Sequence, residues 1–293
     1  MPNLKEVRNR ITSVNSTRQI TSAMKMVSAA KLKKAQDAIT QMRPYAEKLS
    51  EILSNLSTTL DASEGVYAAQ RDEKKVLIVA VTSNRGLCGA FNANINKSIL
   101  KAINGEFAGK EVDVLSVGKK AFDVFKKTEN LISNDNLQQH YNEIFDQLDF
   151  EHAAEIAQQI MDSYANEDYD RVVVVYNKFK NAAVQEVMFE QFLPIVPPSE
   201  EEASTSEVDY LFEPSRQEIL DSIIPKSLKT QFYKALLDSY ASEHGARMTA
   251  MHKATDNAGE LLKELKLSYN KARQAAITNE ILEIVSGAEA LNG

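Results

Sequence analysis

The sequence predicts a long antiparallel coiled coil with a small Rossmann-like α/β domain inserted between its two helices. Heptad-spaced apolar residues run through both ends of the 293-residue chain, and apolar strands alternate with helical segments between them. The segment 226–286 contains no proline, so we expect one helix of about 61 residues, roughly 90 Å long. A compact protein of this size would be only about 50 Å across. The C-terminal helix therefore needs a partner outside a compact core.

The first predicted helix covers residues 1–60. Its apolar residues alternate by three and four positions, first at Leu4, Val7, Ile11 and Val14 and later at Leu32, Ala35, Ile39, Met42, Ala46, Leu49, Leu53, Leu56 and Leu60. Between these runs Arg18 and Thr21 occupy the seam, and the apolar set moves to Ile20, Met24 and Val27, which predicts a local shift of register. Pro44 predicts a bend or the start of a second segment.

The matching helix lies in residues 213–293. Its narrow stripe is rich in small residues and has one polar member, Thr255, among Met248, Met251, Ala258, Leu262, Leu265, Tyr269, Ala272 and Ala276. Such a seam favours close antiparallel pairing with the N-terminal helix. Pro225 predicts a kink or break between a preceding helical segment and the long helix.

Residues 74–212 predict the α/β domain. Buried strands are expected at 74–83, 111–118 and 171–176, one or two more within 182–195, and a short one at 210–212. Helices are expected at 90–104, 119–127 and 150–164. Strands that alternate with helices favour a largely parallel sheet. Residues 57–73 are interpreted as a linker and residues 197–209 as an exposed acidic loop.

Composition and charge narrow the class of protein. With 43% hydrophobic and 26% charged residues, the chain has the composition of an ordinary soluble protein. No apolar run approaches 18 residues, so no membrane-spanning helix is expected. The net charge is −7, yet residues 1–60 hold 10 Lys and Arg against 4 Asp and Glu. A basic helix on an acidic protein implies an acidic neighbour, although a solvated helix face would have the same pattern.

The chemistry of a catalytic site is not apparent in the sequence. The turn 84–92 follows a predicted strand, where α/β proteins bind ligands, but it matches neither the dinucleotide nor the Walker pattern. Gly86, Cys88 and Gly89 are therefore interpreted as a structural turn, with ligand binding as the alternative. Cys88, the single cysteine, is expected to be a packed thiol. The four histidines lack metal-ligand spacing. We expect no catalytic residue, metal or cofactor.

Three segments carry a family resemblance. ITSVNSTRQITSAMKMVSAAKLKKAQ near the start, the turn SNRGLCGAFN, and the ending from ASEHGARMTAMHKATDNAGELL to KARQAAITNEILEIVSGAEAL closely resemble the gamma subunits of F-type ATP synthases, in order and over effectively the whole chain. The resemblance implies a non-catalytic rotary shaft that couples proton flow to ATP synthesis. Its partners would be the alpha and beta subunits, the epsilon subunit and the membrane rotor (c) ring. Without a transit peptide pattern, the location implied is peripheral, at the cytoplasmic face of a bacterial inner membrane.

The same resemblance implies which residues meet the alpha/beta hexamer. Arg273, Gln274 and Thr278 match family residues that hydrogen-bond to loops of beta. The apolar tip of the C-terminal helix would turn inside an apolar sleeve of the hexamer; its residues are Ile281, Leu282, Ile284 and Val285. The N-terminal helix would flank the C-terminal helix lower down, with Met24 and Lys25, and would present cations to acidic loops of beta. A solvated helix face remains the alternative for the three polar residues.

Two other classes of function stay open at this point. The basic N-terminal residues would also suit a nucleic-acid-binding protein with a coiled-coil arm. Against this reading, they lack interleaved aromatic residues, and the α/β domain is strongly acidic. An α/β enzyme with a coiled-coil appendage would need a ligand at 84–92.

Overall fold

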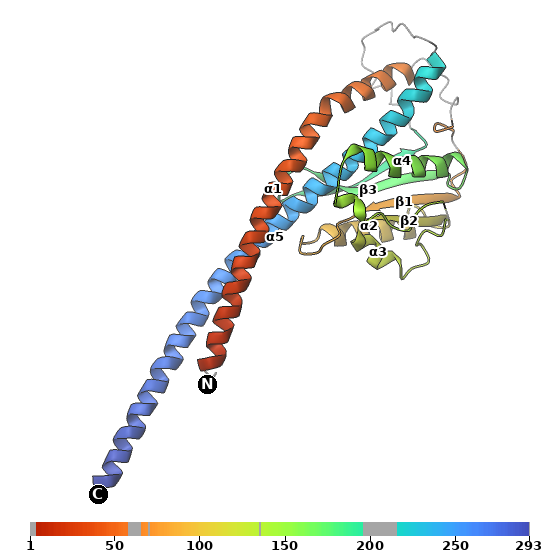
Figure 1. Cartoon of the computed structure of the whole chain (residues 1–293). Helices are drawn as coiled ribbons and strands as arrows, with labels where there is room; N and C mark the ends of the chain where they lie inside the picture. The colour runs from red at the N-terminus through yellow and green to blue at the C-terminus, as the bar shows by residue number, and fades with distance from the viewer. Residues whose placement is uncertain (1–3, 58–65, 70, 135, 196–215, 293) are drawn as a thin grey trace. The chain divides into compact units, whose positions relative to one another are not determined.

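A computed structural model of the chain describes residues 4–57, 66–69, 71–134, 136–195 and 216–292 (Figure 1). Its elements, in order, are α1 (Leu4–Ser57), β1 (Lys75–Val81), α2 (Phe91–Asn104), β2 (Glu111–Val117), α3 (Lys119–Phe125), η1 (Glu143–Phe145), α4 (Phe150–Ala165), β3 (Arg171–Phe179), β4 (Gln185–Leu193) and α5 (Arg216–Asn292). Two long terminal helices and a small central α/β sheet confirm the predicted fold class. The predicted loop 197–209, the strand 210–212 and Leu60 lie outside the described residues.

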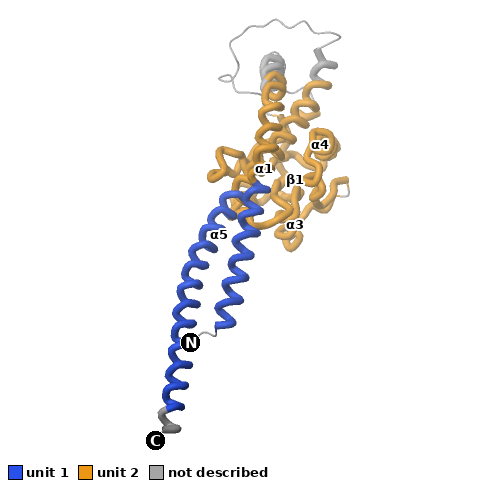
Figure 2. Tube along the Cα trace, turned by 60° about the vertical axis from the view of Figure 1, so that its left-hand side comes forward, with its two compact units in different colours: residues 1–28, 248–293 blue, residues 29–247 orange. Residues whose placement is uncertain are grey.

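Contacts divide the chain into two units. Unit 1 comprises residues 1–28 and 248–293, and unit 2 comprises residues 29–247 (Figure 2). Each unit therefore contains a part of α1 and a part of α5. The sequence-based division into segments 1–60, 74–212 and 213–293 followed the order of elements along the chain, and it stays a prediction.

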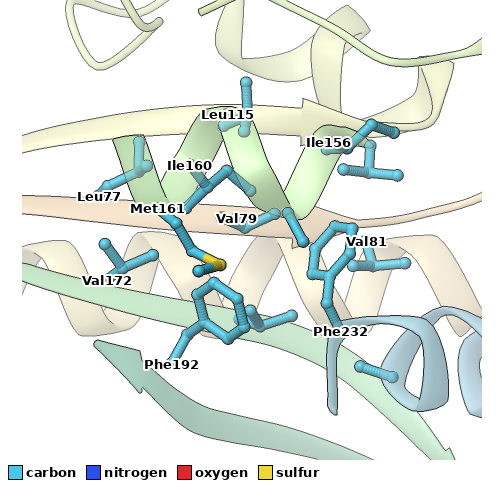
Figure 3. Close-up of a cluster of buried hydrophobic side chains, with 14 of the residues drawn as sticks. Leu77, Val79, Val81, Leu115, Ile156, Ile160, Met161, Val172, Phe192 and Phe232 are labelled. Atoms are coloured by element: carbon cyan, nitrogen blue, oxygen red, sulfur yellow. The ribbon is translucent and has the colours of Figure 1, made fainter. Parts of the chain in front are cut away.

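The sheet of unit 2 has the strand order β2-β1-β3-β4. The first three strands are parallel, and β4 lies antiparallel to β3 at the edge, so residues 182–195 contribute one strand. Residues 76–81 of β1 are fully buried because helices cover both faces of the sheet. Val76, Ile78 and Ala80 pack with α2 and α3, whereas Leu77, Val79 and Val81 pack in the core that contains α4 (Figure 3).

The helix α5 completes this second core. Leu228, Phe232 and Leu236 join the cluster beneath α4 and are at most 3% exposed. Further along α5, a Cβ atom at Gly245 would lie 3.1 Å from Ala182 Cα, so the helix runs very close to the turn between β3 and β4. Ser242 donates a hydrogen bond to the Asn177 carbonyl oxygen at 2.9 Å. The helix is thus part of the α/β core as well as of the coiled coil.

Both prolines lie inside continuous helices. Pro44 is an interior residue of α1 and Pro225 of α5, so the new segment predicted as one option at Pro44 and the break predicted as one option at Pro225 are wrong. A proline removes one backbone hydrogen bond and costs roughly 3 kcal/mol in a helix interior. Buried apolar residues such as Leu32 and Ala35 of α1 and Leu228 of α5 offset this cost, because helix stability in proteins comes mainly from packing.

The seam of unit 1 also differs from its prediction. Residues of α1 and α5 run side by side there (Figure 2), and the buried residues of the polar stretch lie at positions of the original heptad. Thr21 and Ser28 are buried, while Ile20 and Val27 are 60% and 58% exposed. The predicted shift of register to Ile20, Met24 and Val27 is therefore wrong. Thr21 can be buried in the seam because it has a polar partner there: Thr21 Oγ1 lies 2.8 Å from Thr255 Oγ1.

Gly118, directly before α3, generates a first testable prediction. It has φ +105°, and a Cβ atom there would lie 2.1 Å from the Thr82 carbonyl oxygen. We expect Gly118→Ala to destabilise the chain by about 3 kcal/mol or more, because backbone strain and a backbone clash add. Gly109 is the matched control, since its φ is +83° and no atom lies within 4 Å of the place that an added methyl group would occupy. Equal losses for Gly118→Ala and Gly109→Ala in urea unfolding would contradict the prediction.

Candidate functional surfaces

The C-terminal part of α5 carries an exposed polar strip. Arg273, Gln274 and Thr278 all lie on the helix surface, with Gln274 and Thr278 one turn apart on the same face. Thr278 donates its hydroxyl hydrogen to the Gln274 carbonyl oxygen at 2.9 Å, which leaves Oγ1 able to accept a hydrogen bond. The Arg273 guanidinium, about 100° further round the helix than Gln274, offers hydrogen-bond donors. The strip can therefore exchange hydrogen bonds with another chain in both directions.

An exposed apolar surface follows directly on the same helix. Successive residues advance by about 100°, so its members cover an arc of about 160° around the helix. They are 48–71% exposed: Ile277, Ile281, Leu282, Ile284 and Val285. Apolar side chains gathered in this way on a single helix indicate a surface that another protein covers.

Met24 and Lys25 of α1 are half-buried and belong to a separate surface. Next to them, Ile20, Met26 and Val27 are 58–65% exposed. The structure does not bring this surface together with the C-terminal one. Thr21 faces Thr255, which precedes Arg273 on α5 by about 27 Å of helix. The residues predicted to contact partners thus form two surfaces of unit 1.

The turn 84–92 in unit 2 is held by its own polar groups. Asn92 accepts a hydrogen bond from the Ser83 backbone N–H at 3.0 Å and donates to Cys88 Sγ at 3.2 Å. Asn84 donates to the Asn142 carbonyl oxygen at 2.7 Å and accepts from the Lys119 N–H at 3.0 Å. The structural turn stays the prediction for this segment, with its polar side chains hydrogen-bonded within unit 2.

Cys88 and its neighbours in this turn match that interpretation. Cys88 is 1% exposed, and burial raises the pKa of its thiol, partly opposed by Arg247. A protonated thiol is a poor nucleophile. Gly89 has φ +60° and Leu87 has φ +62°. The Leu87 side chain is 65% exposed at the apex of the turn.

Arg247 of α5 anchors the turn from the side. Its Nη2 donates to the Arg85 carbonyl oxygen at 3.0 Å, and its Nε donates to the Gly86 carbonyl oxygen at 3.3 Å. Nη1 lies 2.6 Å from Glu243 Oε1 and 3.3 Å from His244 Nδ1. Because Arg247, Glu243 and His244 are all less than 10% exposed, this cluster replaces water with internal hydrogen bonds.

The electrostatics of the cluster follow from its burial. Burial raises the pKa of the Glu243 carboxyl, and the Arg247 guanidinium opposes that rise. Burial also lowers the pKa of His244 to about 3, with Arg247 and Lys31 adding to the effect. His244 is therefore neutral near pH 7. Its Nδ1 accepts from Arg247, while Nε2 is buried without a hydrogen-bond partner.

Sequence reasoning missed the Arg247 cluster and the Thr21–Thr255 pair. The sequence contains one indication of the cluster, which is an acidic residue four positions before an arginine on a helix. That spacing is common on exposed helices and does not reveal burial. Among the described ranges, no group of three His, Cys, Asp or Glu side chains has the arrangement of a metal site. Within the same ranges, no helix is long and apolar enough to cross a membrane.

Comparisons with known proteins give a consistent result. The family model described as ATP synthase matches residues 3–291. The ATP synthase gamma chain of Flavobacterium johnsoniae is 64% identical over 294 residues, covering all of both chains. A chain from the central stalk and c-ring of the Tetrahymena thermophila mitochondrial ATP synthase is 26% identical with a TM-score of 0.59, over 80% of this chain and 99% of that one. A chain of the Euglena gracilis mitochondrial ATP synthase has a TM-score of 0.65 at 21% identity, over 98% of this chain and 94% of that one.

Removal of Arg247 tests the buried ion pair. We expect Arg247→Met to destabilise the chain by about 3–5 kcal/mol, because it leaves the Glu243 carboxylate buried without its partner. The double variant Arg247→Met/Glu243→Gln should recover part of this loss in urea unfolding. The exposed Lys253 of the same helix provides the control Lys253→Met. A double variant as unstable as Arg247→Met would contradict the account.

His244 predicts a pH dependence with a definite sign. Its pKa is about 3 in the folded chain and 6.5 when unperturbed, so below pH 6.5 the unfolded chain binds a proton that the folded chain does not. Stability is therefore lost as pH falls from 6.5 towards 3. We expect His244→Gln to lessen the loss between pH 6 and pH 4 by about 2 kcal/mol, as measured by urea unfolding at each pH. The control is His252→Gln, at an exposed histidine of α5; equal slopes in both variants would contradict this prediction.

Proposed function

Because this chain belongs to the ATP synthase family, among its gamma chains, we propose that it is the central rotary shaft of an F1Fo ATP synthase. It would transmit torque between the membrane rotor ring and the alpha/beta hexamer and so couple proton flow to ATP synthesis. The observation that carries the proposal is the full-length identity of 64% to a gamma chain. The relatives give no support to the alternative of a nucleic-acid-binding protein.

The coiled coil of unit 1 supports the role of a shaft. Its interior contains apolar residues and the Thr21–Thr255 pair, so the two helices hold one another through their own contacts. Its outer surface carries polar and charged residues, and these keep the pair solvated and free to move against a housing. The basic residues of α1 would be attracted by acidic loops of the beta subunits without being locked in one geometry.

The exposed surfaces of unit 1 would be the contacts with the hexamer. Arg273, Gln274 and Thr278 would exchange hydrogen bonds with beta-subunit loops, and the apolar arc from Ile277 to Val285 would turn in an apolar sleeve. Met24 and Lys25, together with the exposed Ile20, Met26 and Val27, would face the housing from α1. A surface with this much exposed apolar area gains stability from such a cover.

Unit 2 would connect the shaft to the rest of the rotor. Together with the epsilon subunit, the α/β sheet and the adjoining parts of α1 and α5 would rest on the c ring. The chain would then act through rotation and carry out no hydrolysis itself, and it would be peripheral at the cytoplasmic face of a bacterial inner membrane. The satisfied polar groups of the turn 84–92 are consistent with this division of labour.

Reconstitution tests the proposed function directly. The purified chain should assemble with alpha and beta subunits and give a complex whose ATPase activity depends on its presence. Circular dichroism would establish that the added chain is helical and folded. A folded chain that neither joins the complex nor changes its ATPase activity would contradict the proposal.

Paired substitutions test the polar strip. In the assembled complex we expect Arg273→Ala/Gln274→Ala to lower ATP turnover by about 10-fold, which corresponds to a loss of about 1.4 kcal/mol, because hydrogen bonds to beta would be lost. The helix content of the free chain should not change, since both side chains are exposed. Asn270→Ala/Lys271→Ala is the matched control one turn earlier on the same exposed helix. Equal turnover in both double variants would show that Arg273 and Gln274 make no such contact.

A further inference from the structure

We infer that the hydrogen-bonded pair Thr21–Thr255 fixes the axial register of α1 against α5 in unit 1. Thr21 is 8% exposed, and its Oγ1 lies 2.8 Å from Thr255 Oγ1 across the seam. The pair therefore joins two helices that are 234 residues apart in sequence. It is a positioning device, because it determines which residues of α5 lie beside α1 and which extend beyond it.

The heptad alone does not select one register. Sliding one helix by seven residues, about 10 Å along its axis, again places apolar residues against apolar residues. The seam of α1 breaks this repetition at four consecutive heptad positions that hold polar residues: Arg18, Thr21, Lys25 and Ser28. A polar residue at a seam position is a known means of selecting register at some cost in stability. Thr21 is the member of this group whose hydroxyl meets a polar side chain of α5.

Each hydroxyl of the pair also has a backbone acceptor on its own helix. Thr255 donates to the Met251 carbonyl oxygen of its own helix at 2.8 Å. Thr21 likewise has the Arg18 carbonyl oxygen of its own helix at 3.1 Å, and either hydroxyl can be the donor across the seam. When one hydroxyl donates to its own helix, the other can donate across the seam, so neither hydroxyl hydrogen is left unpaired.

A change of register removes this bond. A slide by one heptad places Thr21 opposite Met248 or Leu262, and neither side chain has an oxygen acceptor. The net contribution of one hydrogen bond corresponds to a change of about 2- to 13-fold in an equilibrium. Without the hydrogen bond, the equilibrium between registers would shift by this factor, which is enough to populate a second register beside the first.

The register has a consequence for the exposed end of α5. In Figure 2 the C-terminal part of α5 extends past the N-terminal end of α1. A slide by one heptad would lengthen or shorten that extension by about 10 Å and move the strip Arg273–Thr278 by the same amount relative to α1. The importance of this position for partner contacts rests on the proposed function, whereas the register itself does not.

Spin-label distances in the full chain test the inference. Labels at Ser16 of α1 and Asn270 of α5, both exposed, would report the axial offset in a chain whose buried Cys88 is replaced by Ala. We expect one distance in the reference chain. In Thr21→Val/Thr255→Val we expect a second population, displaced by about 10 Å along the helix axis, because valine keeps the shape of threonine without its hydroxyl. Circular dichroism would confirm that the variant is still helical.

Two further variants separate register from general stability. Thr21→Ser/Thr255→Ser keeps both hydroxyls and should retain one distance. Thr17→Val removes a hydroxyl that bonds only the Ser13 carbonyl oxygen of its own helix, at 3.0 Å, and should also retain one distance. A single unchanged distance in the valine pair, or a second population in the serine pair, would overturn the inference. Because the free chain is measured, either result is independent of whether the chain assembles with alpha and beta subunits.

Discussion

The mutual covering of two helices is the constraint on which this structure depends. A helix with an apolar stripe is stable in water only when something buries that stripe. In unit 1 the covering is supplied by the other end of the same chain, with Val7, Met251 and Leu262 at most 5% exposed. In unit 2 the sheet shares the task, since Leu228, Phe232 and Leu236 of α5 belong to the core beneath α4. One helix therefore satisfies two kinds of packing along its length.

Polar groups give this packing its specificity. Apolar contacts fix how much surface is buried, but they tolerate sliding and rotation. The Arg247 guanidinium holds the backbone of the turn at Arg85 and Gly86, and Ser242 holds the carbonyl group of Asn177. These directional bonds place α5 on the α/β sheet at one position. The Thr21–Thr255 pair has the corresponding role in the coiled coil.

The sequence predicted the elements well and their polar details poorly. Apolar runs such as residues 76–81 can be identified without structural knowledge, because a strand buried on both faces needs an apolar residue at every position. The same rule misled the assignment of the seam, where Ile20 and Val27 attracted the prediction and Thr21 proved to be the buried residue. Hydrophobicity cannot reveal a polar partner that is 234 residues away. Pro44 and Pro225 misled it for a related reason, because local propensity was outweighed by long-range packing. The residues predicted to contact the hexamer came from family resemblance, and geometry adds only that they lie in two separate surfaces of unit 1.

The order in which the chain is synthesised gives the arrangement of α1 and α5 a further consequence. A ribosome completes α1 first, and its apolar stripe stays without a partner until α5, the last element, emerges. The core beneath α4 is likewise incomplete until residues 228–236 of α5 arrive. Contacts between distant parts of a chain form slowly, and exposed apolar surface meanwhile favours aggregation. The topology therefore leaves the apolar stripe of α1 uncovered until the last element of the chain has been synthesised.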